Sequence, residues 1–205
     1  MKPTAKPRAG SAAAAAPAES VRDRILNTAR DLFYKEGARA VGVDTVVARS
    51  GVAKTSLYRW FPSKDALIVA VLEQEQKDRW AGWDKTAAMS DPEPRARLRA
   101  HLNGIARYVS SSHFRGCPFM NMIVAFPDPE HPARKLAIEE IEELRRRLRG
   151  LVNNIEGVKS PEVLTEQLML LVDGAFSSAL ALGKNGPQQY LVEAADALID
   201  LQLKN

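Results

Sequence analysis

The chain has 205 residues, of which 45% are hydrophobic and 26% are charged, as is ordinary for a globular protein. Its single cysteine, Cys117, excludes an internal disulfide, and no uninterrupted apolar run approaches the roughly 18 residues that a membrane span needs. These features predict a chain that folds around its own hydrophobic core in the reducing cytoplasm, with no membrane partner.

Basic residues are concentrated towards the N-terminus. Residues 1–64 contain 12 Lys and Arg against 5 Asp and Glu, whereas the rest of the chain contains 17 against 20. A basic head on a slightly acidic body favours a polyanionic partner, without distinguishing DNA from RNA or an anionic membrane. Lys2, Lys6, Arg8 and a run of five alanines predict a disordered basic arm over 1–19.

Helical periodicity dominates after residue 19. The first helices are predicted over 20–36, over 44–50, over 55–61, and from Ser63 towards Trp80. Ser20 is expected to cap the first of them, and Gly51 to separate the second from the third.

Five more helices are predicted in the remaining chain, over 95–111, 119–126, 133–155, 161–182 and 188–203. Strand signals are nearly absent, so the fold class is all-α, with about nine helices. The change in charge balance falls inside the fourth helix. We therefore predict an N-terminal domain over 20–69, with three helices and a helix-turn-helix, and a helical C-terminal domain over 70–205.

The segment 43–61 reads as helix, tight turn, helix. Gly51 permits the positive φ of a sharp reversal, and apolar residues such as Val46 and Leu57 can pack the two helices together. The second helix then presents hydroxyl, aromatic and basic side chains that suit the major groove of DNA. The predicted contacts on this helix are Lys54, Thr55, Ser56, Tyr58, Arg59 and Trp60.

Residues 21–72 resemble the DNA-binding domain of the TetR family of transcriptional repressors, through the segments 32–37, 46–52 and 57–67. The resemblance implies contacts of Tyr58 and Lys64 with the DNA backbone, and Thr45 completes the predicted DNA-binding set. Three residues depart from the family pattern and affect the capping and phosphate contacts: Trp60 stands where His is usual, Ala53 where Ser is frequent, and Gly42 where Thr often caps the preceding helix.

The resemblance also implies a C-terminal domain that dimerises and senses a small molecule. The segments 115–121 and 126–133 are similar to those of one large branch of the family. Residues 163–182 are apolar nearly all round, so together with 190–203 they predict a homodimer through helices within 161–203. The alternative is that 163–182 forms only the central core helix.

A ligand pocket is expected between the fifth and eighth helices. Aromatic, apolar and a few polar residues are its candidate lining: Trp80, Trp83, His101, Ile105, Tyr108, Phe114, Cys117, Met120, Met122, Ile123, Met169, Asp173 and Phe176. Because this set lacks a charge cluster, an apolar or aromatic effector is favoured.

Other functions find less support in the sequence. Cys117, beside Arg115 and near His113, could be a reactive thiol of an electrophile- or redox-sensing repressor, or simply a small buried residue. No set of nucleophile and base, metal ligands or cofactor loop is recognisable, so we expect no enzyme, no metal and no cofactor. A helical DNA-binding protein without a ligand is the remaining alternative.

Overall fold

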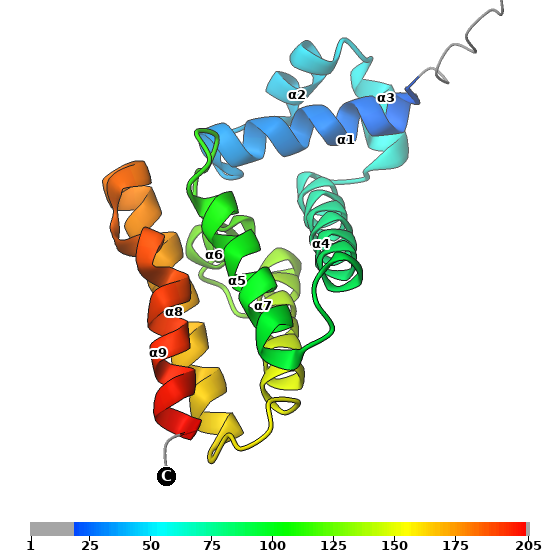
Figure 1. Cartoon of the computed structure of the whole chain (residues 1–205). Coiled ribbons are helices and arrows are strands. Elements are labelled where there is room, and N and C mark those ends of the chain that lie inside the picture. The colour runs from blue at the N-terminus through cyan, green and yellow to red at the C-terminus, as the bar shows by residue number, and fades with distance from the viewer. Residues whose placement is uncertain (1–18, 204–205) are drawn as a thin grey trace, which may run out of the picture.

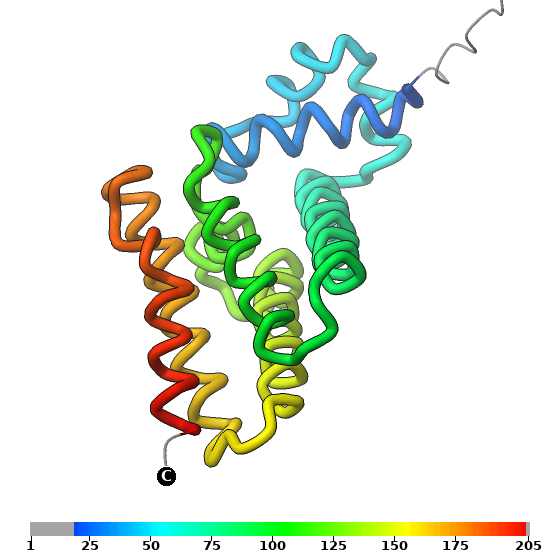
Figure 2. The backbone as a smooth tube through the Cα atoms, viewed as in Figure 1, coloured from blue at the N-terminus to red at the C-terminus, as the bar shows by residue number. Residues whose placement is uncertain are grey.

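The computed structural model describes residues 19–203, which form nine α-helices and no strand (Figures 1 and 2). The predicted all-α class is confirmed. Apart from Glu19, the predicted basic arm lies outside the described residues. The helices are α1 (Val21–Leu32), α2 (Val43–Ser50), α3 (Lys54–Trp60), α4 (Lys64–Met89), α5 (Pro94–Val109), α6 (Pro118–Ala125), α7 (Pro132–Val152), α8 (Pro161–Leu182) and α9 (Leu191–Leu203).

α1 begins as its sequence predicts. The Ser20 hydroxyl oxygen accepts a hydrogen bond from the backbone N–H of Asp23 at 3.1 Å, which satisfies one of the free donors of the first turn. The helix continues into a π-helical turn over Phe33–Gly37. Its apolar face, with Ile25 and Ala29 fully buried, packs on α2 and α4.

α2 and α3 form the predicted helix-turn-helix. Gly51 adopts φ +66°, a left-handed conformation that glycine reaches without strain, and the chain reverses there. Val46 and Leu57 are both fully buried and fix the two helices against the rest of the N-terminal domain. α3 therefore has one anchored face and one free face.

α4 is the longest helix of the described residues, and it packs on α1 as well as on α5, α6 and α7. The Ser63 hydroxyl caps it by accepting from the N–H of Ala66 at 3.0 Å. The helix then runs to Met89, nine residues past the predicted end near Trp80, because the next strong breaker is the segment 91–94.

Two large clusters of buried hydrophobic residues make up the core. The first joins α1 to α4 and also takes in Phe119 of α6 and Ala133 of α7. The second joins α5, α7, α8 and α9. Since α6 packs on the N-terminal helices, the first cluster extends across the domain boundary predicted near residue 70. Phe176 of α8 packs against both clusters.

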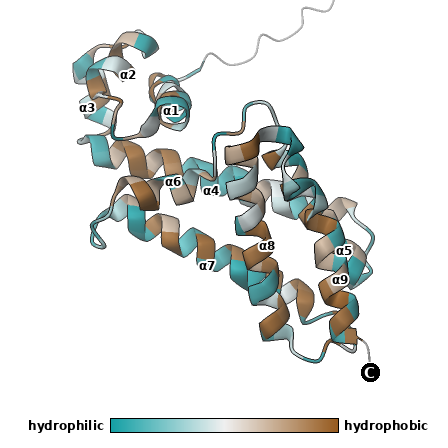
Figure 3. Ribbon diagram, turned by 90° about the vertical axis from the view of Figure 1, so that its left-hand side faces the viewer, coloured by the Kyte–Doolittle hydropathy of each residue, from teal (hydrophilic) through white to brown (hydrophobic). Residues whose placement is uncertain are grey.

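α8 differs from the expectation that no segment is long and apolar enough for a membrane. Within 19–203, the stretch Pro161–Asn185 meets that criterion by length and composition, since it contains an 18-residue window with a mean hydropathy of 1.2. The buried core helix of a globular protein meets it too, and Leu164 and Leu168 of α8 are fully buried against neighbouring helices. Val163, Leu170, Leu180 and Leu182 of α8 nevertheless remain exposed, and Figure 3 shows hydrophobic stretches along both α8 and α9.

Candidate nucleic-acid interface and ligand cavity

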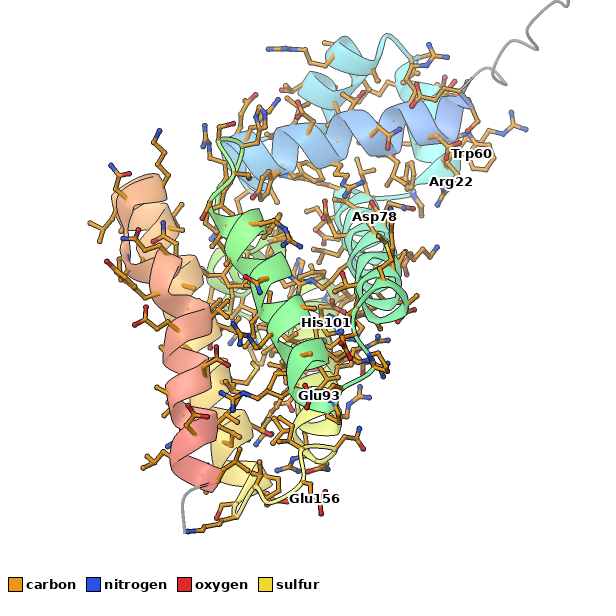
Figure 4. The ribbon with its side chains drawn as sticks, viewed as in Figure 1. Arg22, Trp60, Asp78, Glu93, His101 and Glu156 are labelled. Carbon is orange, nitrogen blue, oxygen red and sulfur yellow. The ribbon has the colours of Figure 1, made fainter. Side chains whose placement is uncertain are left out.

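The free face of α3 carries the predicted DNA contacts. Tyr58 and Trp60 are large side chains that remain 43% and 51% exposed, and Figure 4 shows Trp60 pointing away from the body of the protein. Lys54, Thr55 and Arg59 are exposed, Ser56 is half-buried, and Thr45 of α2 is exposed nearby. The helix thus offers hydroxyl, aromatic and cationic groups on one accessible surface.

An ion pair ties α3 to α2 across the turn. Lys54 Nζ lies 2.6 Å from Asp44 Oδ1, and this hydrogen bond raises the pKa of Lys54. Both side chains are exposed, so the pair contributes little to stability. A phosphate group can therefore replace Asp44 as the partner of Lys54 at small cost.

Lys64, the first residue of α4, is already partly engaged. Its Nζ donates a hydrogen bond to the carbonyl oxygen of Arg39 at 3.1 Å, which links α4 to the chain between α1 and α2. The side chain is half-buried. The departures from the family pattern also have a structural counterpart, because neither Gly42 nor Ala53 caps its helix with a side chain.

A cavity of about 410 Å³ lies between α4 and α5, with single contributions from α1, α6, α7 and α8. Aromatic and apolar side chains dominate its wall, and charged groups lie at one edge. The lining residues are Arg30, Glu75, Asp78, Arg79, Trp80, Gly82, Trp83, Thr86, His101, Gly104, Ile105, Tyr108, Pro118, Leu144 and Phe176.

Six of the thirteen ligand-binding residues predicted from the sequence line this cavity. The structure brings together Trp80, Trp83, His101, Ile105, Tyr108 and Phe176. Regular spacing explains why residues 101, 105 and 108 lie together, because they share one face of α5 that is turned towards α4. Gly104 lies on the same face and was missed because glycine has no side chain to mark a pocket.

The other candidates lie outside the cavity wall. Phe114 sits behind it, 5.5 Å from the Tyr108 ring and 5.8 Å from the Phe176 ring. Cys117, Met122 and Ile123 pack in or against the first cluster, because α6 turns towards the N-terminal helices. Met169 is buried in the second cluster, and Met120 and Asp173 are exposed.

The expectation of a cavity without a charge cluster was wrong. Arg30 Nη1 lies 2.6 Å from Asp78 Oδ2, and Arg30 Nε also donates to Glu75 Oε1. Arg79 completes the charged group. Glu75 and Arg79 precede Trp83 at four-residue spacing, so the sequence does indicate that they share a face of α4 with it. This inference needs a helix that continues past Trp80, whereas the predicted helix ended near that residue. Arg30 comes from a different domain and carried no local signal.

His101 is an uncharged polar group inside the cavity wall. It is only 4% exposed, and its ring stacks on Trp83 with a centroid distance of 3.8 Å. Burial, assisted by the positive charges of Arg97 and Arg147, lowers the pKa of His101 to about 4. Its Nε2 is buried with no hydrogen-bond partner among the described residues. Such a group is available to a ligand.

A buried carboxylate behind the wall fixes the orientation of Trp80. Glu140 of α7 is fully buried and accepts hydrogen bonds from Trp80 Nε1 at 3.0 Å and from Gln76 Nε2 at 2.9 Å. Arg79 Nε lies 3.5 Å from its other oxygen. Burial raises the pKa of Glu140, while these three partners oppose the shift. Glu140 lies in a highly charged stretch of α7, so the sequence alone does not indicate this buried role.

The π-helical turn that follows α1 is hydrogen-bonded to the loop between α5 and α6. Tyr34 Oη accepts from the N–H of Arg115 at 2.8 Å, donates to the carbonyl oxygen of Gly116 at 3.0 Å, and lies 3.4 Å from Tyr108 Oη. Gly116 has φ +93°, and a Cβ there would approach Asn121 Oδ1 to 2.9 Å, so this close turn requires glycine. The DNA-binding domain thus contacts both α4 and the α5–α6 loop beside the cavity.

Cys117 is a buried residue of the first cluster and does not line the cavity. Its nearest polar neighbour is Arg79, whose Nη2 lies 3.5 Å from the sulfur. A thiol in this place is shielded from oxidants and electrophiles, so the alternative of a sensor acting through Cys117 is not favoured.

Comparisons with known proteins agree with this arrangement. Residues 25–71 match the family model for bacterial regulatory proteins of the tetR family. The HTH-type transcriptional regulator YjdC of Escherichia coli is 25% identical over 163 residues, which span 78% of this chain and 83% of that protein. The HTH-type transcriptional activator FasR of Mycolicibacterium smegmatis is 32% identical over 93 residues, or 45% of this chain and 42% of that protein.

The likeness extends to the C-terminal helices. The crystal structure of a TetR-family transcriptional regulator from Streptomyces coelicolor is 27% identical and superposes with a TM-score of 0.85. It covers 90% of this chain and 96% of its own. Residues 25–71 thus match the tetR family model, and the chain as a whole is similar to TetR-family transcriptional regulators in sequence and fold.

Proposed function

We propose that the chain is a homodimeric, cytoplasmic repressor that binds a palindromic operator through α3 and releases it when a small molecule fills the cavity. The observation that carries the proposal is the position of Arg30. This residue belongs to the DNA-binding domain and lines a cavity enclosed mainly by the C-terminal domain. A ligand there would touch both domains at once, which gives it a direct means of favouring one orientation over another.

The DNA contacts proposed are the exposed groups of α3 together with Thr45 and Lys64. Tyr58 and the cations Lys54 and Arg59 suit the phosphate backbone, while Thr55 and Ser56 near the start of α3 suit base edges. A basic arm over 1–19 would extend this interface, because the start of α1 lies near the end of α3. Arg22 there lies 5.6 Å from the centre of the Phe61 ring.

The second subunit is proposed to dock on α8 and α9. Large apolar side chains are exposed along these helices: Val163, Leu170, Leu180, Leu182, Tyr190 and Leu201. A continuous apolar face is costly in water, and covering it with its own copy gives the two-fold symmetry that a palindromic operator requires. The expected interface buries roughly 1,200 Å² or more in total.

The test begins with a selection of duplexes from a random DNA library by the full chain. We expect a palindromic consensus whose half-sites are about one helical turn apart, or a multiple of it. The logarithm of its affinity should fall steeply with the logarithm of salt concentration. Binding without any sequence preference would contradict the proposed repressor and favour a helical protein that binds DNA without a specific operator.

A further inference from the structure

The charged edge of the cavity consists of one cation shared by two carboxylates. Arg30 donates to both Glu75 and Asp78, and the second oxygen of Asp78 accepts from Gln74 Nε2 at 2.8 Å. Glu75 and Asp78 belong to α4, whereas Arg30 belongs to α1, so this is also a contact between the two domains. Figure 4 shows Asp78 on the part of α4 that lies beneath α1.

The balance of charge at this edge is negative. Arg79 is the other cation among the cavity residues, and it is already opposed by the buried Glu140 at 3.5 Å and stacked over the Phe119 ring at 4.6 Å. Arg30 therefore neutralises only one of the two carboxylates that it contacts. The site has a surplus of one negative charge beside a largely apolar wall.

The rest of the wall suits a cation with a flat apolar body. Trp80, Trp83, Tyr108 and Phe176 contribute aromatic rings, and the faces of such rings attract positive charge. Because Arg147 lies 4.2 Å over the Trp80 ring and His101 stacks on Trp83, the rings of Tyr108 and Phe176 are the ones left to face a ligand cation. His101 is buried and lacks a hydrogen-bond partner at Nε2, and being neutral it does not repel a cation. Its unsatisfied nitrogen is the polar group that a ligand could engage from the opposite side of the cavity.

We propose that the effector is a singly charged cation on a flat apolar or aromatic body, and that its ammonium or amidinium group replaces Arg30 between Glu75 and Asp78. The inference rests on the proposed function and specifies the ligand class of the same cavity. It replaces the expectation of a purely apolar effector with an amphipathic one. A volume of about 410 Å³ accommodates a fused bicyclic ring system with a short amine side chain.

The exchange has a mechanical consequence. Arg30 near the end of α1 and Tyr34 in the π-helical turn that follows lie about one turn apart. Arg30 binds α4 at the cavity edge, and Tyr34 binds the α5–α6 loop. A ligand cation that takes the carboxylates leaves Arg30 without its two partners on α4, while the apolar packing of α1 on α4 remains. The loss of this polar link is expected to let α1 turn on that packed face. The ligand thus binds the turned state better than the docked state.

The ligand class is tested without DNA, by calorimetric titration of the full chain with three naphthalene probes. These are 1-naphthylmethylammonium, the neutral 1-naphthylmethanol and the anionic 1-naphthoate. We expect the cation to bind about tenfold more tightly than the alcohol, and naphthoate most weakly. Equal affinity for cation and alcohol, tightest binding of naphthoate, or no binding of the cation at millimolar concentration would each overturn the proposal.

Variants locate the preference. Glu75→Gln and Asp78→Asn should each reduce the cation-to-alcohol ratio several-fold, because each removes one of the two carboxylates. Glu73→Gln is the matched control, since Glu73 is exposed on the same helix and does not line the cavity. A ratio that survives both cavity variants, or falls equally in the control, contradicts the assigned position of the cation.

The link to DNA is measured separately with the selected operator. The cation should weaken operator binding by the unaltered chain, whereas Arg30→Met should bind operator more weakly from the start and respond little to the probe. Failure of the chain to bind any operator refutes the proposed function and leaves the probe titration valid. Specific operator binding that is insensitive to a bound cation refutes only the exchange with Arg30.

Discussion

The proposed DNA interface and the proposed ligand cavity of this molecule are built in opposite ways. The interface comes almost wholly from residues 43–64, where a short turn and two buried anchors present a polar helix face to solvent. The cavity is assembled from six helices, with lining residues between Arg30 and Phe176. A local motif leaves its pattern in the sequence, whereas a cavity depends on how distant helices pack.

The largest effect is expected from a substitution that removes a buried anchor of the helix-turn-helix. Leu57 is fully buried and holds α3, so Leu57→Ala should lower the free energy of unfolding by about 2–5 kcal/mol. Its exposed neighbour gives the contrast, since Tyr58→Ala should change stability by less than about 0.5 kcal/mol while weakening DNA binding. Urea denaturation and DNA titration of the two variants measure this. A stable Leu57→Ala protein would contradict the assigned anchor.

Acidification should act on the cavity rather than on the interface. Because burial lowers the pKa of His101 from 6.5 to about 4, only the unfolded chain binds its proton between those pH values. The stability that the neutral, buried His101 adds to the folded state is fully present above about pH 6.5 and is lost as the pH falls towards 4. The free energy of unfolding should be lower by on the order of 2 kcal/mol at about pH 5.

Urea unfolding of the native chain and His101→Gln at about pH 7.5 and about pH 5 isolates this effect. The variant should lose less stability on acidification. Glu140, whose pKa is raised by burial, acts in the opposite direction but is common to both proteins. Equal acid sensitivity in the two proteins would show that His101 is not held neutral by the fold.

A third substitution tests dimerisation separately from the proposed DNA interface and the cavity. Leu170 is 72% exposed on α8, and Leu170→Arg would place two like charges across a two-fold interface. We expect the dissociation constant of the dimer to rise about 100-fold, which light scattering at micromolar concentration would detect as monomer. Val124→Arg serves as the control, since Val124 is exposed and apolar on α6, outside the proposed interface. A chain that remains fully dimeric with Arg at position 170 has its interface elsewhere.

The smallest effect concerns one phosphate contact. Lys64→Ala should weaken operator binding less than tenfold, similarly for all sequences, and reduce the salt slope by about one unit. Lys85→Ala is matched, because Lys85 is exposed further along α4. If the slope is unchanged, Lys64 serves only its hydrogen bond to the carbonyl of Arg39.

The fold could be predicted from the sequence because helix signals are local. Ser20, Ser63 and Gly51 act within a few residues, and the structure confirms each of them. The end of α4 was predicted too early, near Trp80 rather than at Met89. Polar and apolar residues continue the helical pattern past Trp80, and no strong breaker intervenes before residue 91.

The cavity could be predicted only in part, for reasons that the missed residues make clear. His101, Ile105 and Tyr108 share a face of one helix, so periodicity brings them together. Arg30 lines the cavity only because α1 packs across α4, and Cys117 leaves it only because α6 turns towards α1. Such packing between distant segments has no signature in residue spacing.

The central claim is that occupation of the cavity controls DNA binding without dissolving the dimer, and a filled cavity tests it most directly. Gly104 lines the cavity, and a Cβ added there meets nothing closer than 3.9 Å, so Gly104→Phe would fill the space from within α5. Gly104→Ala is the control, because it also replaces the helical glycine with a better helix former but adds little volume.

Operator affinity and molecular mass are then measured on the same two samples. We predict that Gly104→Phe binds operator about tenfold more weakly than Gly104→Ala while both remain dimeric. Equal operator affinity in the two variants, or a loss of affinity that follows dissociation into monomers, would contradict the account.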